Sequence, residues 1–216
     1  MKNIILFDLD GTITDPKVGI TKSVQHALRY FNINVENPDD LCCFIGPPLR
    51  GAFREYYGFS EADANKAVEI YREYFTEKGI FENILYPGMK DLLIKLKAQN
   101  KTLILATSKA AVFAERILKH FGIYELFNFI SGAELNGERS EKFEVIAYAL
   151  EKNNIKDLDS CIMVGDRKHD IIGAKKAGIE SVGVLYGYGS VEELTEAEPT
   201  YIAKNIDELA ELFLNL

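Results

Sequence analysis

Five short apolar runs, rich in β-branched residues, constrain the fold of this chain most strongly. They are NIILF (3–7), TLILA (102–106), NFIS (128–131), CIMVG (161–165) and SVGVL (181–185). Each run is mostly apolar on both faces, which is typical of parallel strands covered by helices on both sides. Helical patterns alternate with them, at 87–100, 111–122, 140–154 (with Ser140 as the N-cap) and 168–178. This alternation predicts an α/β fold, with a doubly wound, mostly parallel sheet in a Rossmann-like core.

One connection is too long for this scheme. Roughly ninety residues separate Asp10 from Thr102, whereas a strand-helix-strand crossover needs only about 30 in all. The helix at 87–100 already supplies the crossover. The excess reads as three helices, at 18–33, 48–58 and 60–79, with no strand pattern between them. We therefore expect an α-helical cap domain at 15–82, inserted into a core made of 1–14 and 83–216.

Charge and cysteine content narrow the class of protein. The formal net charge of −8 argues against binding to a nucleic acid polymer or an anionic membrane surface. No apolar stretch reaches the roughly 18 residues that a membrane span needs, and the N-terminus lacks the pattern of a signal peptide. The three cysteines, Cys42, Cys43 and Cys161, form no CxxC pair and suggest reduced thiols in a cytoplasmic protein.

Two aspartates follow the first apolar run. Strand side chains alternate between faces, so Asp8 and Asp10 are expected to project to the same side. Gly11 permits a tight turn directly afterwards. Two carboxylates a few ångströms apart repel each other, and a cation would relieve that repulsion. The alternative is that one carboxylate caps a loop while the other is solvated.

A second acidic pair follows the strand at 161–165. Asp166 comes directly after it, and Asp170 lies four residues further on, near the start of a helix. The first strand and this one are expected to be neighbours in the sheet, which would bring four carboxylates together at the strand ends. Hard oxygen ligands of this kind suit Mg²⁺, which usually binds together with phosphate.

A phosphate would also need hydrogen-bond donors and positive charge. Thr107 and Ser108 stand at a strand end that leads into a helix, where free N–H groups favour an anion, although these hydroxyls could simply cap the helix. Lys142, one turn into its helix, could reach the same rim of the sheet. Lys109 and Arg139 are rivals for that role, and a solvated lysine is the plain alternative.

These features together resemble a known family. FDLDGT (7–12), LILATSK (103–109), Lys142 and VGDRKHDIIGAKKAG (164–178) resemble, in order and type, the motifs of the haloacid dehalogenase-like hydrolases. The inserted helices resemble that family's α-helical cap, and the layout is similar to its phosphoglycolate phosphatase-like branch. CFIGPPLRGAF (43–53) is similar to the subset known as 5′-nucleotidases.

The resemblance implies catalytic roles. Asp8 would be the nucleophile that forms an aspartyl-phosphate, and Asp10 the general acid and then the general base. Thr107 would bind the transferring phosphoryl group together with Ser108 and Lys109. Lys142 would pair with Asp8 and phosphate. Many relatives have a proline after this lysine, whereas Phe143 follows it here, which leaves Arg139 as an outside candidate.

The resemblance also implies a cofactor and a reaction. Asp8, the main-chain carbonyl of Asp10, Asp166 and Asp170 would hold Mg²⁺. We expect a Mg²⁺-dependent phosphomonoester hydrolase for a small phosphorylated metabolite such as a nucleoside 5′-monophosphate. In the cap, Arg50 follows Pro47 and Pro48, which would rigidify the approach to a helix; it is our candidate for binding substrate, and the alternative is a surface arginine. The alternatives are a phosphoglycolate phosphatase, a phosphoglucomutase-like phosphotransferase and, in a different class, a non-catalytic phosphate-binding protein. The oligomeric state does not follow from the sequence.

Overall fold

The computed structural model describes residues 2–216, which divide into two compact units. The first unit contains residues 2–15 and Leu85–Leu216, and the second contains Pro16–Ile84. Two short strands, β2 (Thr14–Asp15) and β3 (Ile84–Leu85), pair with each other where the chain passes between the units.

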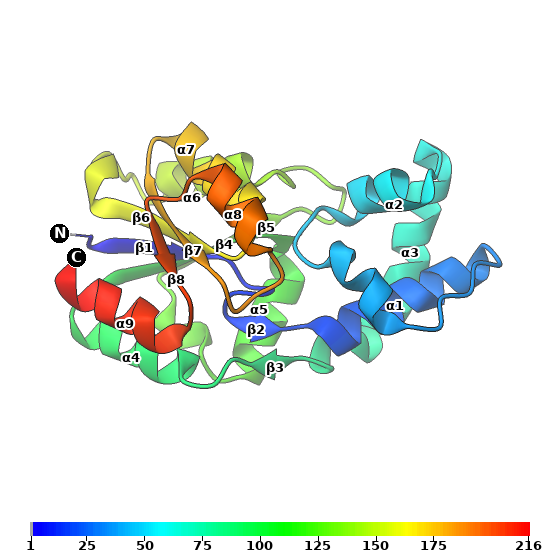
Figure 1. Cartoon of the computed structure of the whole chain (residues 1–216), viewed down its shortest axis with the longest axis horizontal. Helices are drawn as coiled ribbons and strands as arrows, with labels where there is room; N and C mark the ends of the chain where they lie inside the picture. Colours follow the sequence, from blue (N-terminus) through cyan, green and yellow to red (C-terminus); the bar gives the residue numbers. More distant parts are fainter. Residues whose placement is uncertain (1) are drawn as a thin grey trace. The chain divides into compact units, whose positions relative to one another are not determined.

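A six-stranded sheet forms the centre of the first unit. Its strands are β1 (Ile4–Phe7), β4 (Thr102–Ala110), β5 (Phe129–Ala133), β6 (Cys161–Gly165), β7 (Glu180–Val184) and β8 (Tyr201–Ala203). Their order is β5-β4-β1-β6-β7-β8, and every neighbouring pair is parallel (Figure 1). The prediction of a doubly wound parallel sheet is confirmed, and β8 is an addition that was not predicted.

Helices cover both faces of this sheet. They are α4 (Met89–Ala98), α5 (Ala111–His120), α6 (Lys142–Lys152), α7 (Lys168–Ala177), α8 (Val191–Ala197) and α9 (Ile206–Asn215). Figure 1 shows α6 and α7 on one side of the sheet and α4 and α9 on the other. On the first side, Leu6 and Met163 pack with Ile146 in one buried cluster. On the second, the ring of Phe213 lies 6.4 Å from that of Phe7.

The start of α6 differs from the prediction. Ser140 is not the N-cap: the helix begins at Lys142, and Glu141 is the capping residue. The main-chain N–H of Glu141 donates to the Glu144 carboxylate at 3.2 Å, and its carbonyl accepts the first helical hydrogen bond, from Val145 at 3.1 Å. Lys142 therefore lies at the first helical position rather than one turn into the helix.

The strand order identifies where a ligand should bind. The chain leaves β1 for β4 and β5 on one side and then returns to build β6, β7 and β8 on the other. In doubly wound sheets, ligands bind at such a switch point, outside the carboxyl ends of the strands. Here the switch point lies between β1 and β6, and both strands are followed directly by aspartates.

The second unit is helical. It consists of α1 (Lys17–Tyr30), α2 (Leu49–Tyr57) and α3 (Glu61–Glu77), with 3₁₀ turns at Pro38–Phe44 and Gly79–Phe81. Its core contains packed aromatic side chains: the tilted rings of Phe44 and Phe53 lie 4.9 Å apart, and the stacked rings of Tyr71 and Phe75 lie 5.2 Å apart. The helices at 18–33, 48–58 and 60–79 are thus found within a few residues of their predicted bounds.

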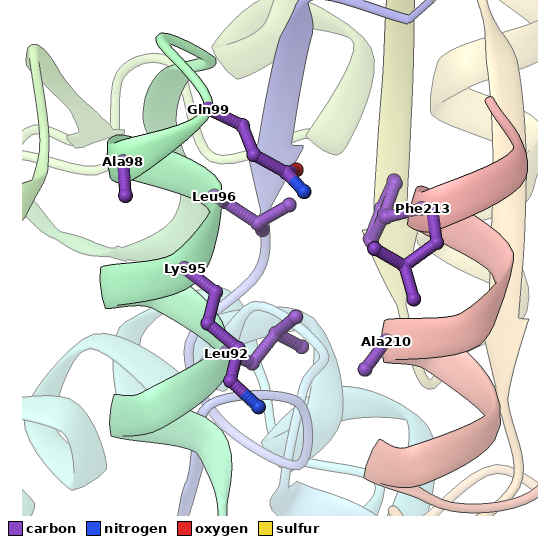
Figure 2. A pocket seen from close by; sticks show the side chains of 8 residues that line it. Leu92, Lys95, Leu96, Ala98, Gln99, Ala210 and Phe213 are labelled. Carbon is purple, nitrogen blue, oxygen red and sulfur yellow. The ribbon is translucent and has the colours of Figure 1, made fainter.

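A shallow groove of about 310 Å³ lies between α4 and α9 (Figure 2). Its lining is mainly apolar and contains none of the predicted site residues; it consists of Leu92, Lys95, Leu96, Ala98, Gln99, Ala210, Phe213 and Leu214. Among the described residues, no helix is both long and apolar enough to span a membrane.

Candidate active site

The Asp8–Asp10 segment leaves the sheet through a tight turn. The Asp8 N–H donates to the Val164 carbonyl at 2.9 Å, which continues the β1–β6 pairing by one residue. The Leu9 carbonyl then accepts hydrogen bonds from the N–H groups of residues 12, 13 and 14. Gly11 has φ +83°, and a Cβ there would lie 2.1 Å from the nearer Asp166 carboxylate oxygen. Only glycine allows both this backbone conformation and this close approach.

Three carboxylates meet at the switch point. Asp8, Asp166 and Asp170 each place one oxygen within 4.8 Å of the others, and all three are buried. Asp166 follows β6 directly, and Asp170 lies in the first turn of α7. Gly165 allows this packing, because a Cβ there would lie 2.1 Å from the Asp170 carboxyl carbon. The predicted convergence of the two acidic pairs is found for these three residues.

The Asp10 side chain lies outside this group. One of its oxygens forms an ion pair of 2.8 Å with Lys109, and both side chains are about nine-tenths buried. The Asp10 carboxylate is therefore arranged apart from the other three. Metal binding through the main-chain carbonyl of Asp10 stays a prediction.

The Lys142 ammonium contacts the carboxylate cluster. Its Nζ lies 2.7 Å from Asp8 Oδ1 and 2.8 Å from Asp170 Oδ1, and it donates to the Ala106 carbonyl at 3.1 Å. Burial alone would lower the pKa of Lys142, but the charges of Asp170 and Asp8 raise it by more, so the ammonium stays protonated. Gly173 of α7 allows this packing, because a Cβ there would lie 2.9 Å from Lys142 Cγ.

Arg139, the alternative candidate for the cationic role, contacts Gly132, Glu134 and Tyr148. Its Nε donates to the Gly132 carbonyl at 2.9 Å, and its guanidinium also pairs with Glu134. The same group lies 3.8 Å from the centroid of the Tyr148 ring. The geometry therefore favours Lys142 for the cationic role beside Asp8.

The donor set fits a divalent metal ion. If all three carboxylates are ionised, three negative charges face the one positive charge of Lys142, which leaves a local formal charge of −2. Asp8 Oδ1 and Asp170 Oδ1 are buried and have no hydrogen-bond partner among the described residues, although both lie within ion-pair distance of Lys142. Buried oxygens with spare capacity, in a cluster to which only carboxylates contribute among the described residues, suit a hard divalent cation.

Burial also changes the acidity of the carboxyl groups. It raises the pKa of Asp166 well above the usual value, and the nearby charges of Asp170 and Asp8 add to the effect. Burial raises the pKa of Asp170 too, against the opposing effect of Lys142. The pKa of Asp10 is raised by burial despite its pairing with Lys109. A bound cation would favour the ionised form of each ligand.

The Thr107–Lys109 segment differs from expectation. The strand does not end at Ala106: β4 continues to Ala110, with a register shift against β5 between Thr107 and Ala110. The helix α5 begins at Ala111 with Ala110 as its N-cap, so neither Thr107 nor Ser108 caps it. Thr107 is buried, and its hydroxyl accepts the Lys109 N–H at 3.2 Å. Irregularities of this kind often re-aim side chains beside active sites.

The sequence reasoning missed a loop that follows β7. The Tyr188 N–H donates to Asp166 Oδ2 at 2.7 Å, and the Thr12 hydroxyl donates to Asp166 Oδ1 at 3.3 Å. The Tyr186 hydroxyl donates to the Thr12 carbonyl at 3.0 Å. Two glycines around a tyrosine, directly after an apolar strand, were the sequence signal that could have indicated this loop.

Arg50, the residue predicted to bind substrate, lies in α2 of the second unit and is exposed. Its role in substrate binding stays a prediction.

Comparisons with known proteins agree with this geometry. The family described as haloacid dehalogenase-like hydrolase matches residues 5–184. A 5′-nucleotidase of Pseudomonas aeruginosa is 44% identical over 208 residues, which cover 96% of this chain and 94% of that protein. The tyrosine-protein kinase PtkA of Mycobacterium tuberculosis is 39% identical over 96% of this chain and 71% of its own length. The crystal structure of a predicted phosphatase from Clostridium acetobutylicum has a TM-score of 0.98 and 49% identity, with both chains covered completely.

The chain belongs to the haloacid dehalogenase-like hydrolase family. Within that family it is a phosphatase, as the sequence analysis predicted.

Proposed function

We propose that this phosphatase is a Mg²⁺-dependent phosphomonoester hydrolase that works through an aspartyl-phosphate on Asp8. One observation carries the proposal: the buried Asp8 carboxylate contacts Lys142 at 2.7 Å and shares a site of metal-ligand geometry with Asp166 and Asp170. Asp8, Asp166, Asp170 and the main-chain carbonyl of Asp10 would hold the ion. When bound, Mg²⁺ offsets negative charge on the phosphoryl oxygens.

The reaction would proceed in two displacements. In the first, an Asp8 oxygen forms a bond to phosphorus while the ester P–O bond breaks, and Asp10 gives its proton to the leaving oxygen. In the second, Asp10 takes a proton from water, whose oxygen attacks phosphorus and releases Asp8 and inorganic phosphate. Burial of Asp10 supports the acid role, because it raises the pKa of that carboxyl.

The other groups would bind and orient the phosphoryl group. The Lys142 ammonium, 2.7 Å from the Asp8 carboxylate, would offset negative charge on the phosphoryl oxygens. Thr107, Ser108 and Lys109 would contribute donors from the irregular end of β4. Lys109 pairs with Asp10 here, which places an ammonium group beside the acid–base residue.

A nucleoside 5′-monophosphate is the substrate class that we favour. The support is the 44% identity to a 5′-nucleotidase over nearly the whole chain, together with the CFIGPPLRGAF segment. Selectivity would come from the second unit, where Arg50 lies. Phosphoglycolate is the second candidate, because relatives of about 30% identity carry the name phosphoglycolate phosphatase. The three cysteines, Cys42, Cys43 and Cys161, are thiols rather than members of disulfide bonds, which supports a cytoplasmic enzyme.

The experiment is a phosphate-release assay of wild type and Asp8→Asn on a substrate panel with Mg²⁺. The panel contains nucleoside monophosphates, phosphoglycolate, sugar phosphates and phosphotyrosine. We expect Asp8→Asn to lose turnover by a factor on the order of 10⁴ or more while its circular dichroism spectrum is unchanged, because the nucleophile is removed from an intact fold. Appreciable residual turnover would refute the nucleophile assignment.

The panel also separates the alternatives. A phosphotransferase of the phosphoglucomutase type would require a bisphosphate activator and release little free phosphate. The absence of phosphate release from every compound would favour a non-catalytic phosphate-binding protein.

A further inference from the structure

The loop after β7, residues 186–189, passes directly over Asp166. We refer to Tyr186, Gly187, Tyr188 and Gly189 as the tyrosine loop. Its glycines make the approach possible: a Cβ on Gly187 would lie 2.3 Å from Asp166 Cβ, and a Cβ on Gly189 would lie 2.0 Å from the Asp166 carbonyl oxygen. Real Cβ atoms are not found so close to other heavy atoms, so the tyrosine loop can lie here only with glycines at these positions.

The side chains of the tyrosine loop hold it against the turn that follows Asp8 and Asp10. The Tyr188 hydroxyl donates a hydrogen bond to the carboxylate of Asp15, at the end of that turn. The Tyr186 hydroxyl donates to the Thr12 carbonyl at 3.0 Å, and its ring lies edge-on to that of Tyr86 at 5.1 Å. The tyrosine loop thus connects Asp166 with the segment that carries Asp8.

The two carboxylate oxygens of Asp166 accept hydrogen bonds of different length. Oδ2 accepts a hydrogen bond of 2.7 Å from the Tyr188 main-chain N–H, whereas Oδ1 has only a 3.3 Å contact with the Thr12 hydroxyl. Oδ1 is therefore the oxygen with the greater remaining capacity to accept a cation. Outer-shell groups that orient a ligand in this way commonly change metal affinity by about 10–100-fold.

We propose that Tyr188 is a positioning residue for metal binding: its hydroxyl, anchored on Asp15, holds its main-chain N–H against Asp166 and so orients that carboxylate toward Asp8 and Asp170. This role rests on the metal site proposed above. Neither Tyr188 nor Asp15 contacts the metal or the substrate in this scheme.

The test compares Tyr188→Phe with wild type in direct metal binding. Mg²⁺ alone is titrated calorimetrically, and Mn²⁺ is followed by the electron paramagnetic resonance signal of the free ion. Because Tyr188→Phe keeps the ring and the main-chain donor, we expect affinity to fall by about tenfold, the lower end of the outer-shell range. In turnover assays, the Mg²⁺ concentration for half-maximal rate should rise by a similar factor, while the rate at saturating Mg²⁺ stays within twofold.

Tyr201→Phe is the matched control. Tyr201 lies on the edge strand β8, so the same substitution removes a tyrosine hydroxyl away from the cluster. Its metal affinity should equal that of wild type. Asp15→Asn should weaken binding as Tyr188→Phe does, and the double variant should lose no more than the larger single loss, because both changes disrupt the same hydrogen bond.

The outcomes separate this inference from the proposed function. If Asp166→Asn abolishes Mg²⁺ binding but Tyr188→Phe binds within twofold of wild type, the positioning role is wrong and the metal site stands. Fully additive losses in the double variant would also overturn the inference. If wild type binds no Mg²⁺, the metal site and the positioning role fall together.

Discussion

Lys142→Met is the most informative single substitution in the core, because it removes a cation that pairs with two of the clustered carboxylates, Asp8 and Asp170. The Lys142 side chain is 3% exposed, and those of its partners Asp8 and Asp170 are 4% and 1% exposed. Methionine approximates the length of the lysine stem without its charge. The substitution therefore leaves two buried carboxylates without their cation and also loses the hydrogen bond to the Ala106 carbonyl.

Breaking a buried ion pair by removing one partner typically costs about 3–5 kcal/mol. For a chain of this size, about 2–4 °C of melting temperature corresponds to each kcal/mol, so we expect a fall of about 6–20 °C in EDTA. Mg²⁺ should recover part of this loss, because a bound cation offsets the same carboxylates. The phosphatase rate at saturating Mg²⁺ should fall by about 10²–10³, the effect of losing one preorganised donor at the transferring group.

Differential scanning calorimetry measures the fall in melting temperature, and Lys175→Met is the control. Lys175 forms a 2.9 Å pair with Glu198, but those side chains are 47% and 80% exposed, so solvent screens the interaction. The control should melt close to wild type. If Lys142→Met melts no lower than Lys175→Met in EDTA, Lys142 does not neutralise the carboxylate cluster.

Two further predictions concern Asp166 and the loop that covers it. Burial raises the pKa of the Asp166 carboxyl, so its contribution to stability is full below about pH 4 and is lost as the pH rises through the folded-state pKa. In EDTA, the melting temperature of wild type minus that of Asp166→Asn should therefore fall as the pH rises above about pH 4, and Mg²⁺ should remove the fall. A difference that does not change with pH would contradict the buried-carboxyl interpretation. Gly187→Ala would place a Cβ 2.3 Å from Asp166 Cβ. We expect it to lower the free energy of unfolding by about 1–3 kcal/mol and to weaken Mg²⁺ binding. Gly51→Ala is the control, because nothing lies within 4 Å of its Cβ, and it should have neither effect.

Much of the core could be predicted from the sequence, because its strands are buried on both faces. Runs such as 161–165 are continuously apolar, and the structure assigns β6 to the same five residues. The aspartates that follow β1 and β6 could be placed together for a related reason: parallel neighbours end at the same edge of a sheet. The edge strand β8 has only three residues, of which Ile202 is exposed, and so has no comparable pattern.

Details that depend on competition between neighbouring residues could not be predicted. Ser140 and Glu141 can both cap a helix, and the reciprocal contact with Glu144 favours the glutamate. The pairing of Lys109 with Asp10 depends on the irregular extension of β4, for which the apolar pattern has no signature.

The tyrosine loop was missed for a different reason. The main-chain N–H of Tyr188 donates a hydrogen bond to Asp166, and the Tyr188 hydroxyl donates one to Asp15, which lies 173 residues away in the sequence. Neither interaction produces a local periodicity that sequence reasoning could use.

The parallel order of the sheet also affects how the chain is made. Ile4 of β1 is in register with Thr102 of β4 and Cys161 of β6, so both partners are translated about 100 and 160 residues after it. At about 5–20 residues per second, the ribosome reaches β6 roughly 8–30 seconds after it has made β1. Until β4 is made, roughly 5–20 seconds after β1, the apolar IILF segment has neither of its native neighbours, and it lacks the second until β6 is made. We therefore expect the nascent chain to need a chaperone at its N-terminal end during this time.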